Sequence, residues 1–228
     1  MHKVSGALLI KLTELKLLVS GMVFMIRVVF IVLFLSSCGN LPITYIQNFS
    51  SVNSVVFGFP DYEVTEEIFN EYENSFIKVR FGRGPHAILI LAYEEDNVYE
   101  WIGNDSVKIY TLNGRIVKTV GLNSNIEILR PSDNIFLTSD LYETINLFNP
   151  DLISSTIHRS MNSRKATIKK LGRSIQVNRI EESFDLDLIG WSGVNLYYQN
   201  TTTGQIESSE QRIHPRLPIV KIEYYFKY

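Results

Sequence analysis

The sequence predicts a mainly β fold, an antiparallel meander that forms a sandwich or an open barrel and carries about two short helices. From Ser75 onward, apolar and polar residues alternate with a period of two, which is typical of strands with one buried face. Short runs of this kind are separated by Asn, Asp and Gly residues that favour tight turns. The segments 61–74 and 140–148 carry helical signals instead.

The N-terminal segment has the pattern of a bacterial lipoprotein signal. Arg27 precedes the apolar run 28–35, and this run ends at Leu-Ser-Ser-Cys, which matches a lipobox. A positive residue, an apolar run and small residues before the cleavage site are typical of secretory signals. We therefore expect residues 1–37 to be a cleaved signal peptide and Cys38, whose thiol takes the diacylglycerol, to be lipidated.

An uncleaved membrane anchor is the alternative. Residues 17–35 are mostly apolar and nearly reach the ~20 residues that span a bilayer. Arg27 falls inside that window, however, where a charge is costly. A start at Met22 or Met25 would leave a compact lipoprotein signal.

The expected location is the outer membrane, on its periplasmic face. Gly39 follows the lipidated cysteine, in place of the Asp that retains lipoproteins in the inner membrane of enteric-type bacteria. The chain from Cys38 onward holds 18 basic and 23 acidic residues, a formal charge of −5. Such a chain is not expected to bind nucleic acid, and its acyl chains must supply the membrane attachment.

Residues 38–60 are expected to be a tether, because apolar residues are scattered there among Asn, Ser and Pro without a clear period. The β-rich periplasmic domain is expected to cover residues 61–228. It begins with a predicted helix over 61–74, for which Asp61 can serve as the N-cap. One face of this helix would carry Val64, Ile68, Phe69 and Tyr72.

A meander of about five strands follows this helix. The strands are predicted at 76–81, 87–92, 98–102, 107–112 and 115–121. Asn113-Gly114 is the strongest hairpin signal in the chain, because both turn positions must accept a positive φ.

A second helix is predicted over 140–148, because Asp140 and Glu143 have capping-box spacing and Pro150 follows. Beyond it, a hairpin is predicted around Gly172. Its strands are expected at 166–171 and 174–180, and further strands are expected at 194–199, 205–213 and 219–226.

The residues indicate no catalytic centre, metal site or cofactor. His86, His158 and His214 are isolated and lack a second ligand at a familiar spacing. Paired carboxylates that a glycosidase would need are candidates on composition only. They are Glu94, Glu95 and Asp96, then Glu181 and Glu182, then Asp185 and Asp187.

Trp101, Trp191 and Arg115 are the candidate glycan contacts. Trp101 and Trp191 are the only tryptophans, and aromatic faces can stack on sugar rings or else fill a β core. Arg115 follows the Asn-Gly turn and either pairs with an acid or carries function. A basic stretch could contact an acidic polysaccharide or lipid phosphates, or could be an ordinary solvated strand face. It holds Arg159, Arg164, Lys165, Lys169, Lys170, Arg173 and Arg179.

Residues 80–122 resemble the YjbF and GfcB lipoproteins of group 4 capsule and exopolysaccharide operons. The matching positions are the strand Leu89–Tyr93, Trp101 and the segment 112–122 with its Asn-Gly-Arg. The C-terminal part is also similar, while residues 125–185 match poorly. The C-terminal matches are Thr203, Gly204, Gln205, Ser209, Gln211, Pro215, Pro218 and a closing strand.

The resemblance implies a non-enzymatic periplasmic lipoprotein that assists polysaccharide secretion or assembly. It implies two partners, the polysaccharide and an outer-membrane β-barrel protein of the same operon. Of the functional positions, only Cys38 carries over from the family. A periplasmic glycan-modifying enzyme and a purely structural lipoprotein that supports the barrel protein are the alternatives.

Overall fold

The computed structural model describes residues 59–103, 106–133, 136, 140–148 and 153–227. The chain divides into two compact units, residues 1–53 and 54–228, and the described residues all belong to the second. The signal peptide, Cys38 and most of the tether therefore lie outside the described residues.

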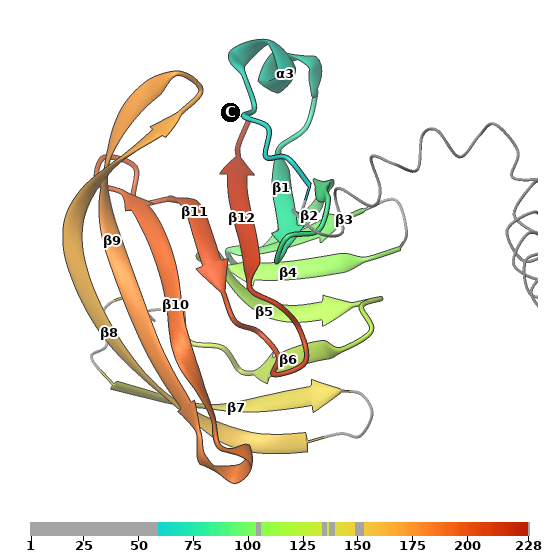
Figure 1. Cartoon of the computed structure of the whole chain (residues 1–228), viewed down its shortest axis with the longest axis vertical. Coiled ribbons are helices and arrows are strands. Elements are labelled where there is room, and N and C mark those ends of the chain that lie inside the picture. Colours follow the sequence, from blue (N-terminus) through green and yellow to red (C-terminus); the bar gives the residue numbers. More distant parts are fainter. Residues whose placement is uncertain (1–58, 104–105, 134–135, 137–139, 149–152, 228) are drawn as a thin grey trace, which may run out of the picture. The chain divides into compact units, whose positions relative to one another are not determined.

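Twelve antiparallel strands form a closed barrel in which each strand pairs with its neighbours in the sequence (Figure 1). The barrel closes where the first strand pairs with the last, from Phe76 opposite Tyr225 to Phe81 opposite Val220. The prediction of a mainly antiparallel β fold is confirmed, but the sheet is neither a sandwich nor an open barrel. Closure gives both the first and the last strand a neighbour on each side, so neither is an edge strand of the sheet.

The strands follow one another along the chain with few long connections. They are β1 (Phe76–Phe81), β2 (His86–Glu95), β3 (Val98–Ile102), β4 (Lys108–Leu112), β5 (Arg115–Val120), β6 (Asn125–Leu129), β7 (Asp140–Phe148), β8 (Ile153–Lys170), β9 (Arg173–Leu186), β10 (Trp191–Asn200), β11 (Ile206–Gln211) and β12 (Val220–Tyr225). The helical elements among the described residues are α3 (Glu66–Glu71) and a 3₁₀ turn, η3 (Asp187–Ile189).

Most of the predicted strands and turns are confirmed. Asn113 and Gly114, at the turn between β4 and β5, have φ values of 51° and 76°. The predicted hairpin around Gly172 exists, but its strands β8 and β9 are far longer than the sequence suggested. Strand β6 was not expected, and it joins β5 through the single pairing of Lys118 with Glu127.

The predicted helix over 140–148 is wrong, because this segment is strand β7. Glu143, Ile145 and Leu147 are buried and alternate with residues on the other face. The segment pairs with β8 from Asp140 to Leu147. Long-range pairing outweighed the local capping signal, since a helix here would leave one side of β6 and one side of β8 without backbone hydrogen-bond partners.

The N-terminal helix exists, but it is shorter than predicted. Thr65 rather than Asp61 is the N-cap, and its hydroxyl accepts a hydrogen bond from the Ile68 amide at 3.3 Å. Asp61 instead pairs with Lys78 at 3.3 Å and with His86 at 2.9 Å. The apolar side of α3 and its flanks packs on the barrel's outer face in a small cluster. Its buried members are Val64, Phe76 and Tyr225.

The main core fills the barrel interior with inward-facing side chains from almost every strand. Aliphatic residues such as Ile109, Ile145 and Ile222 make up most of this core, and each is at most 1% exposed. Polar and charged side chains are buried among them, and these define the site described next. Within the described residues, no helix is long and apolar enough to cross a bilayer.

Candidate functional site

A large cavity opens among three turns of the barrel. Its volume is about 820 Å³, within the range of sites that bind small molecules. Asn97 lies in the β2–β3 turn, Asn113 and Gly114 in the β4–β5 turn, and Gly204 in the β10–β11 turn. The cavity continues inward to Tyr224 of β12, which is fully buried.

The walls of this cavity combine amide and aromatic side chains. Six of the residues that line it are amides, and four are aromatic. The amides are Asn97, Asn113, Asn162, Asn178, Gln199 and Gln205. The aromatic residues are Tyr99, Phe136, Tyr224 and Phe226. Among the described lining residues there is no lysine or arginine, and Asp133 is the one carboxylate.

Gly114 connects this cavity to the polar interior. Its carbonyl accepts hydrogen bonds from Gln211 Nε2 at 2.9 Å and from Tyr224 Oη at 2.8 Å. A Cβ added at Gly114 would lie 2.5 Å from the Ile206 side chain. Glycine therefore meets two requirements here, the positive φ of the turn and the close approach of β11.

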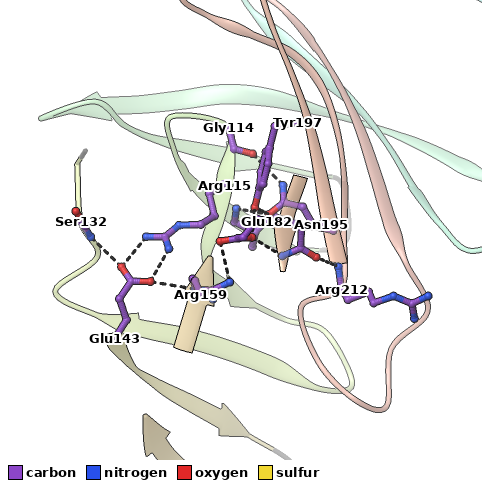
Figure 2. A network of polar contacts seen from close by, with 11 residues as sticks. Gly114, Arg115, Ser132, Glu143, Arg159, Glu182, Asn195, Tyr197 and Arg212 are labelled. Atoms are coloured by element: carbon purple, nitrogen blue, oxygen red, sulfur yellow. Dashed lines mark hydrogen bonds and ion pairs between the residues drawn. The ribbon is translucent and has the colours of Figure 1, made fainter. Parts of the chain in front are cut away.

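A network of buried charges lies in the interior (Figure 2). The Arg115 guanidinium donates two hydrogen bonds to the Glu143 carboxylate, at 2.5 and 2.8 Å. Arg159 donates from Nε to Glu143 at 3.2 Å and from Nη1 to Glu182 at 2.9 Å. The backbone amide of Ser132 donates to Glu143 at 2.9 Å. Two arginines and two glutamates thus balance one another inside the barrel.

Two neutral side chains also donate hydrogen bonds to the Glu182 carboxylate. Asn195 Nδ2 donates to this carboxylate at 2.6 Å and the Tyr197 hydroxyl donates at 2.8 Å. Phe136, which lines the cavity, packs edge-on against the Tyr197 ring with 5.1 Å between centroids. The network therefore lies directly behind one part of the cavity wall.

The surroundings shift the pKa values of Glu143, Arg115 and Tyr197. Burial alone would raise the pKa of Glu143, but the hydrogen bonds and positive charge of Arg115 outweigh it and lower the pKa overall. Burial opposes the charged form of Arg115, yet pairing with Glu143 raises its pKa. Burial, together with the Glu182 charge, raises the pKa of Tyr197 well above its usual value.

The candidate glycan contacts from the sequence fall in different places. Trp101 is fully buried, and its indole nitrogen donates to Thr111 Oγ1 at 2.8 Å. Its ring packs within about 6 Å of Tyr99, Tyr224 and Phe226, so it backs the aromatic wall of the cavity.

Neither Arg115 nor Trp191 lines the cavity. Arg115 is 1% exposed and belongs to the charged network, which answers the question of whether it pairs with an acid. Trp191 is half-buried and packs against Phe184 at 4.7 Å between centroids. It lines a narrow space of about 10 Å³ beside Arg159 and Asn195. Arg115 lines the same narrow space as Trp191, whereas Trp101 does not. Cys38 lies outside the described residues.

The other candidate groups are dispersed. Glu182 forms an ion pair with Arg159, and Glu181 forms ion pairs with Arg179 and with Arg164. None of the candidate carboxylate pairs lines the cavity. Among the described residues no group of three His, Cys, Asp or Glu side chains is placed to hold a metal ion.

Much of the basic stretch forms ion pairs, although the Arg164 and Arg173 side chains stay exposed. Lys170 contacts Glu207 at 2.6 Å and also reaches the Tyr224 carbonyl, while Arg173 contacts Glu66 of α3. Burial lowers the pKa of Lys170, and Glu207 works against that shift.

Sequence reasoning missed the amides of the cavity. Asn178 and Gln199 are direct cross-strand neighbours on β9 and β10, and both line the cavity. Asparagine is uncommon in strands, and several amides on one face would have been a usable signal. Detecting that face required the register between strands that are far apart in the sequence.

Comparison with known proteins agrees with the fold and with the family resemblance. The family model described as "Group 4 capsule polysaccharide lipoprotein gfcB, YjbF" matches residues 49–225. The "Uncharacterized lipoprotein GfcB" of Escherichia coli K12 is 24% identical over 194 residues, which cover 79% of this chain and 88% of that protein. The "Uncharacterized lipoprotein YjbF" of the same strain is 28% identical over 74 residues, which cover 32% of this chain and 35% of that protein.

A solved structure has a similar fold. The crystal structure of the hypothetical lipoprotein YmcC from Escherichia coli K12 superposes with a TM-score of 0.65 at 21% identity. The alignment covers 78% of this chain and 95% of that one. Since the family model spans most of the chain and every strand of the barrel, the chain belongs to the YjbF family of group 4 capsule polysaccharide lipoproteins.

Proposed function

We propose that this chain is an outer-membrane lipoprotein, anchored through Cys38 on the periplasmic face, that acts as a non-enzymatic accessory in capsule or exopolysaccharide secretion or assembly. The family match over residues 49–225 carries the proposal. The lipobox that ends at Cys38 and the Gly39 that follows support the anchor and its membrane.

The arrangement of carboxylates favours a binding role over hydrolysis. Glycosidases use two carboxyl groups about 5–10 Å apart on either side of the scissile bond. Here Glu143 and Glu182 are buried against arginines. Within the described lining of the cavity, Asp133 has no second carboxylate to work with.

The partner is an outer-membrane β-barrel protein of the same operon, and the lipid anchor holds the domain beside it. A mild crosslinker applied to intact cells, followed by purification through a C-terminal tag, should recover such a protein with the wild-type chain. Cys38→Ala should lose this product, because the domain would no longer be held at the membrane.

A gene deletion tests the function directly. Deleting the gene should reduce surface polysaccharide, and the wild-type gene should restore it. Cys38→Ala should fail to restore it and should leave the outer-membrane fraction, while intact mass should show an acylated N-terminal Cys38 in the wild type. Normal polymer in a clean deletion would refute the proposal. An unprocessed chain that retains residues 1–37 would refute the anchor.

A further inference from the structure

We propose that the cavity of about 820 Å³ binds a short, uncharged segment of a glycan chain, through amide side chains and an aromatic wall. This inference rests on the proposed function, which supplies polysaccharide as the ligand.

The charged residues that line the cavity limit the class of ligand that it can bind. Among the described residues that line the cavity there is no Lys or Arg to pair with a phosphate or a carboxylate. Asp133, the one carboxylate, is exposed at the rim and would repel anionic groups. Nucleotides, phospholipid headgroups and the acidic residues of a polysaccharide would therefore gain no ion pair in this site.

The polar walls also disfavour an acyl chain. Asn178 of β9 and Gln199 of β10 lie opposite each other on the face that lines the cavity. Covering such amides with hydrocarbon would remove their hydrogen bonds to water without replacing them. An amide both donates and accepts hydrogen bonds, and this combination suits sugar hydroxyls, which do the same.

The cavity amides differ in whether they already form hydrogen bonds with other groups of the protein. Gln199 Nε2 donates to the Gly204 carbonyl at 2.9 Å, and Asn113 Nδ2 donates to the Asp133 carbonyl at 2.8 Å, so these two hold loops at the rim. Within the part of the chain that the structure describes, the Asn178 amide makes no side-chain hydrogen bond and is half-buried. It is the amide best placed to bind a ligand.

The aromatic wall supplies apolar ring faces, although the Tyr99 and Phe226 rings are tilted by 58° to each other. Phe226 lies 5.5 Å from Tyr99 between ring centroids and stacks on Tyr224 at 6.1 Å with an interplanar angle of 8°. Trp101 packs behind these rings at 5.9 Å from Phe226 and fixes their positions without reaching the cavity. Such a surface can cover the C–H face of a sugar ring while the amides bind its hydroxyls.

The binding test uses the full chain, purified in a detergent without a sugar headgroup. The probes are oligosaccharides released from the surface polysaccharide of cells that carry the gene, before and after chemical reduction of their carboxyl groups. Oligosaccharides from the lipopolysaccharide of the same cells form a second arm. Calorimetric titration at low and high salt measures affinity, because an uncharged contact should not depend on ionic strength.

Three variants test the site, each with a matched control. Ser163→Tyr fills the cavity from β8, and its control Ser154→Tyr places the same side chain at an exposed position of the same strand. Asn178→Ala removes the amide, and Asn70→Ala on α3 is its control. Phe226→Leu keeps apolar volume but loses the ring face. Its control is Tyr142→Leu, a residue 69% exposed on β7. Melting temperatures identify any variant that fails to fold.

We expect saturable, salt-insensitive binding that carboxyl reduction leaves unchanged or strengthens. Ser163→Tyr should abolish binding, and Asn178→Ala and Phe226→Leu should each weaken it by roughly five- to tenfold, the loss of one good contact. The controls should bind like the wild type. Three results would each overturn the inference. They are no saturable binding of oligosaccharides from either source, binding that survives Ser163→Tyr, and binding that is lost at high salt.

Complementation separates this inference from the proposed function. If the deletion lacks polymer and Ser163→Tyr restores it fully, the function stands and the glycan site does not. If the deletion makes normal polymer while the purified chain binds oligosaccharide in the cavity, the site stands and the function does not.

Discussion

Replacing Arg115 with Met tests whether the buried charge network holds the barrel together. Arg115 and Glu143 have side chains that are 2% and 3% exposed, and they make two direct hydrogen bonds. The substitution keeps the apolar stem and removes the charge. Among the described residues, Glu143 then retains Arg159 at 3.2 Å and the Ser132 amide at 2.9 Å as partners.

Breaking one side of a buried ion pair costs about 3–5 kcal/mol, because the remaining charge stays buried and undercompensated. Arg159 still serves Glu143 in the variant, so we expect a loss near the lower end, about 3 kcal/mol. Arg115 Nε also has no hydrogen-bond partner among the described residues. The stability of the wild type is already reduced by this unpartnered group, so removing it with Arg115 makes the variant's loss of stability smaller.

The measurement is the free energy of unfolding by urea at neutral pH, with Lys118→Met as the control. Lys118 and Glu127 form an ion pair at 2.7 Å, but their side chains are 43% and 31% exposed. Solvent screens such a pair, so its loss should cost at most about 1 kcal/mol. The double variant Arg115→Met with Glu143→Leu should recover part of the loss, because it removes the stranded charge.

The pH dependence supplies a second test of the same reasoning. The pKa of Glu143 is lowered in the folded chain, although burial opposes the shift, because Arg115 favours the carboxylate. The stabilisation is therefore present above the usual glutamate pKa and is lost as the pH falls through the lowered value. The stability gap between the wild type and Arg115→Met should narrow on acidification. A gap no larger than that of Lys118→Met at neutral pH would refute the reasoning.

Three further predictions concern the turns and the cavity wall. Gly114→Ala should destabilise the barrel in urea unfolding by clearly more than Gly204→Ala. Both residues have a positive φ, which costs an alanine about 1–2 kcal/mol, but only Gly114 also faces a side chain within 3 Å. Equal losses would contradict this reading. Trp101→Phe should cost about 1–3 kcal/mol by leaving the buried Thr111 hydroxyl without its donor, and thermal melting would show it. Iodide should quench the fluorescence of Trp101 poorly and that of half-buried Trp191 more strongly. Variants that each keep a single tryptophan allow this comparison. Equal quenching of the two would contradict the burial of Trp101.

Local order along most of the chain was predictable from the sequence. The strand Val98–Ile102 was predicted with its observed bounds, because alternation of polar and apolar residues is a property of neighbours in the sequence. The Asn113-Gly114 turn was predictable because few residues accept two successive positive φ values. Segment 140–148 was not, since its local capping signal competed with pairing to β6 and β8.

The candidate site depended on contacts between distant parts of the chain. Arg115 was recognised as a residue that either pairs with an acid or acts, and only the structure placed it against Glu143, 28 residues away. Trp101 was singled out for its aromatic face, but closure of the barrel put it one layer behind the cavity.

The sequence by itself determined the strand-rich character, the tight turns and the family of this protein, because alternation, turn chemistry and motifs are written in neighbouring residues. Only the tertiary structure decided that the sheet closes through β1 and β12 and that Asn178 and Gln199 share a cavity with Phe226. Those outcomes depend on strand register, and a shift of one residue would turn each of these side chains to the opposite face of the sheet.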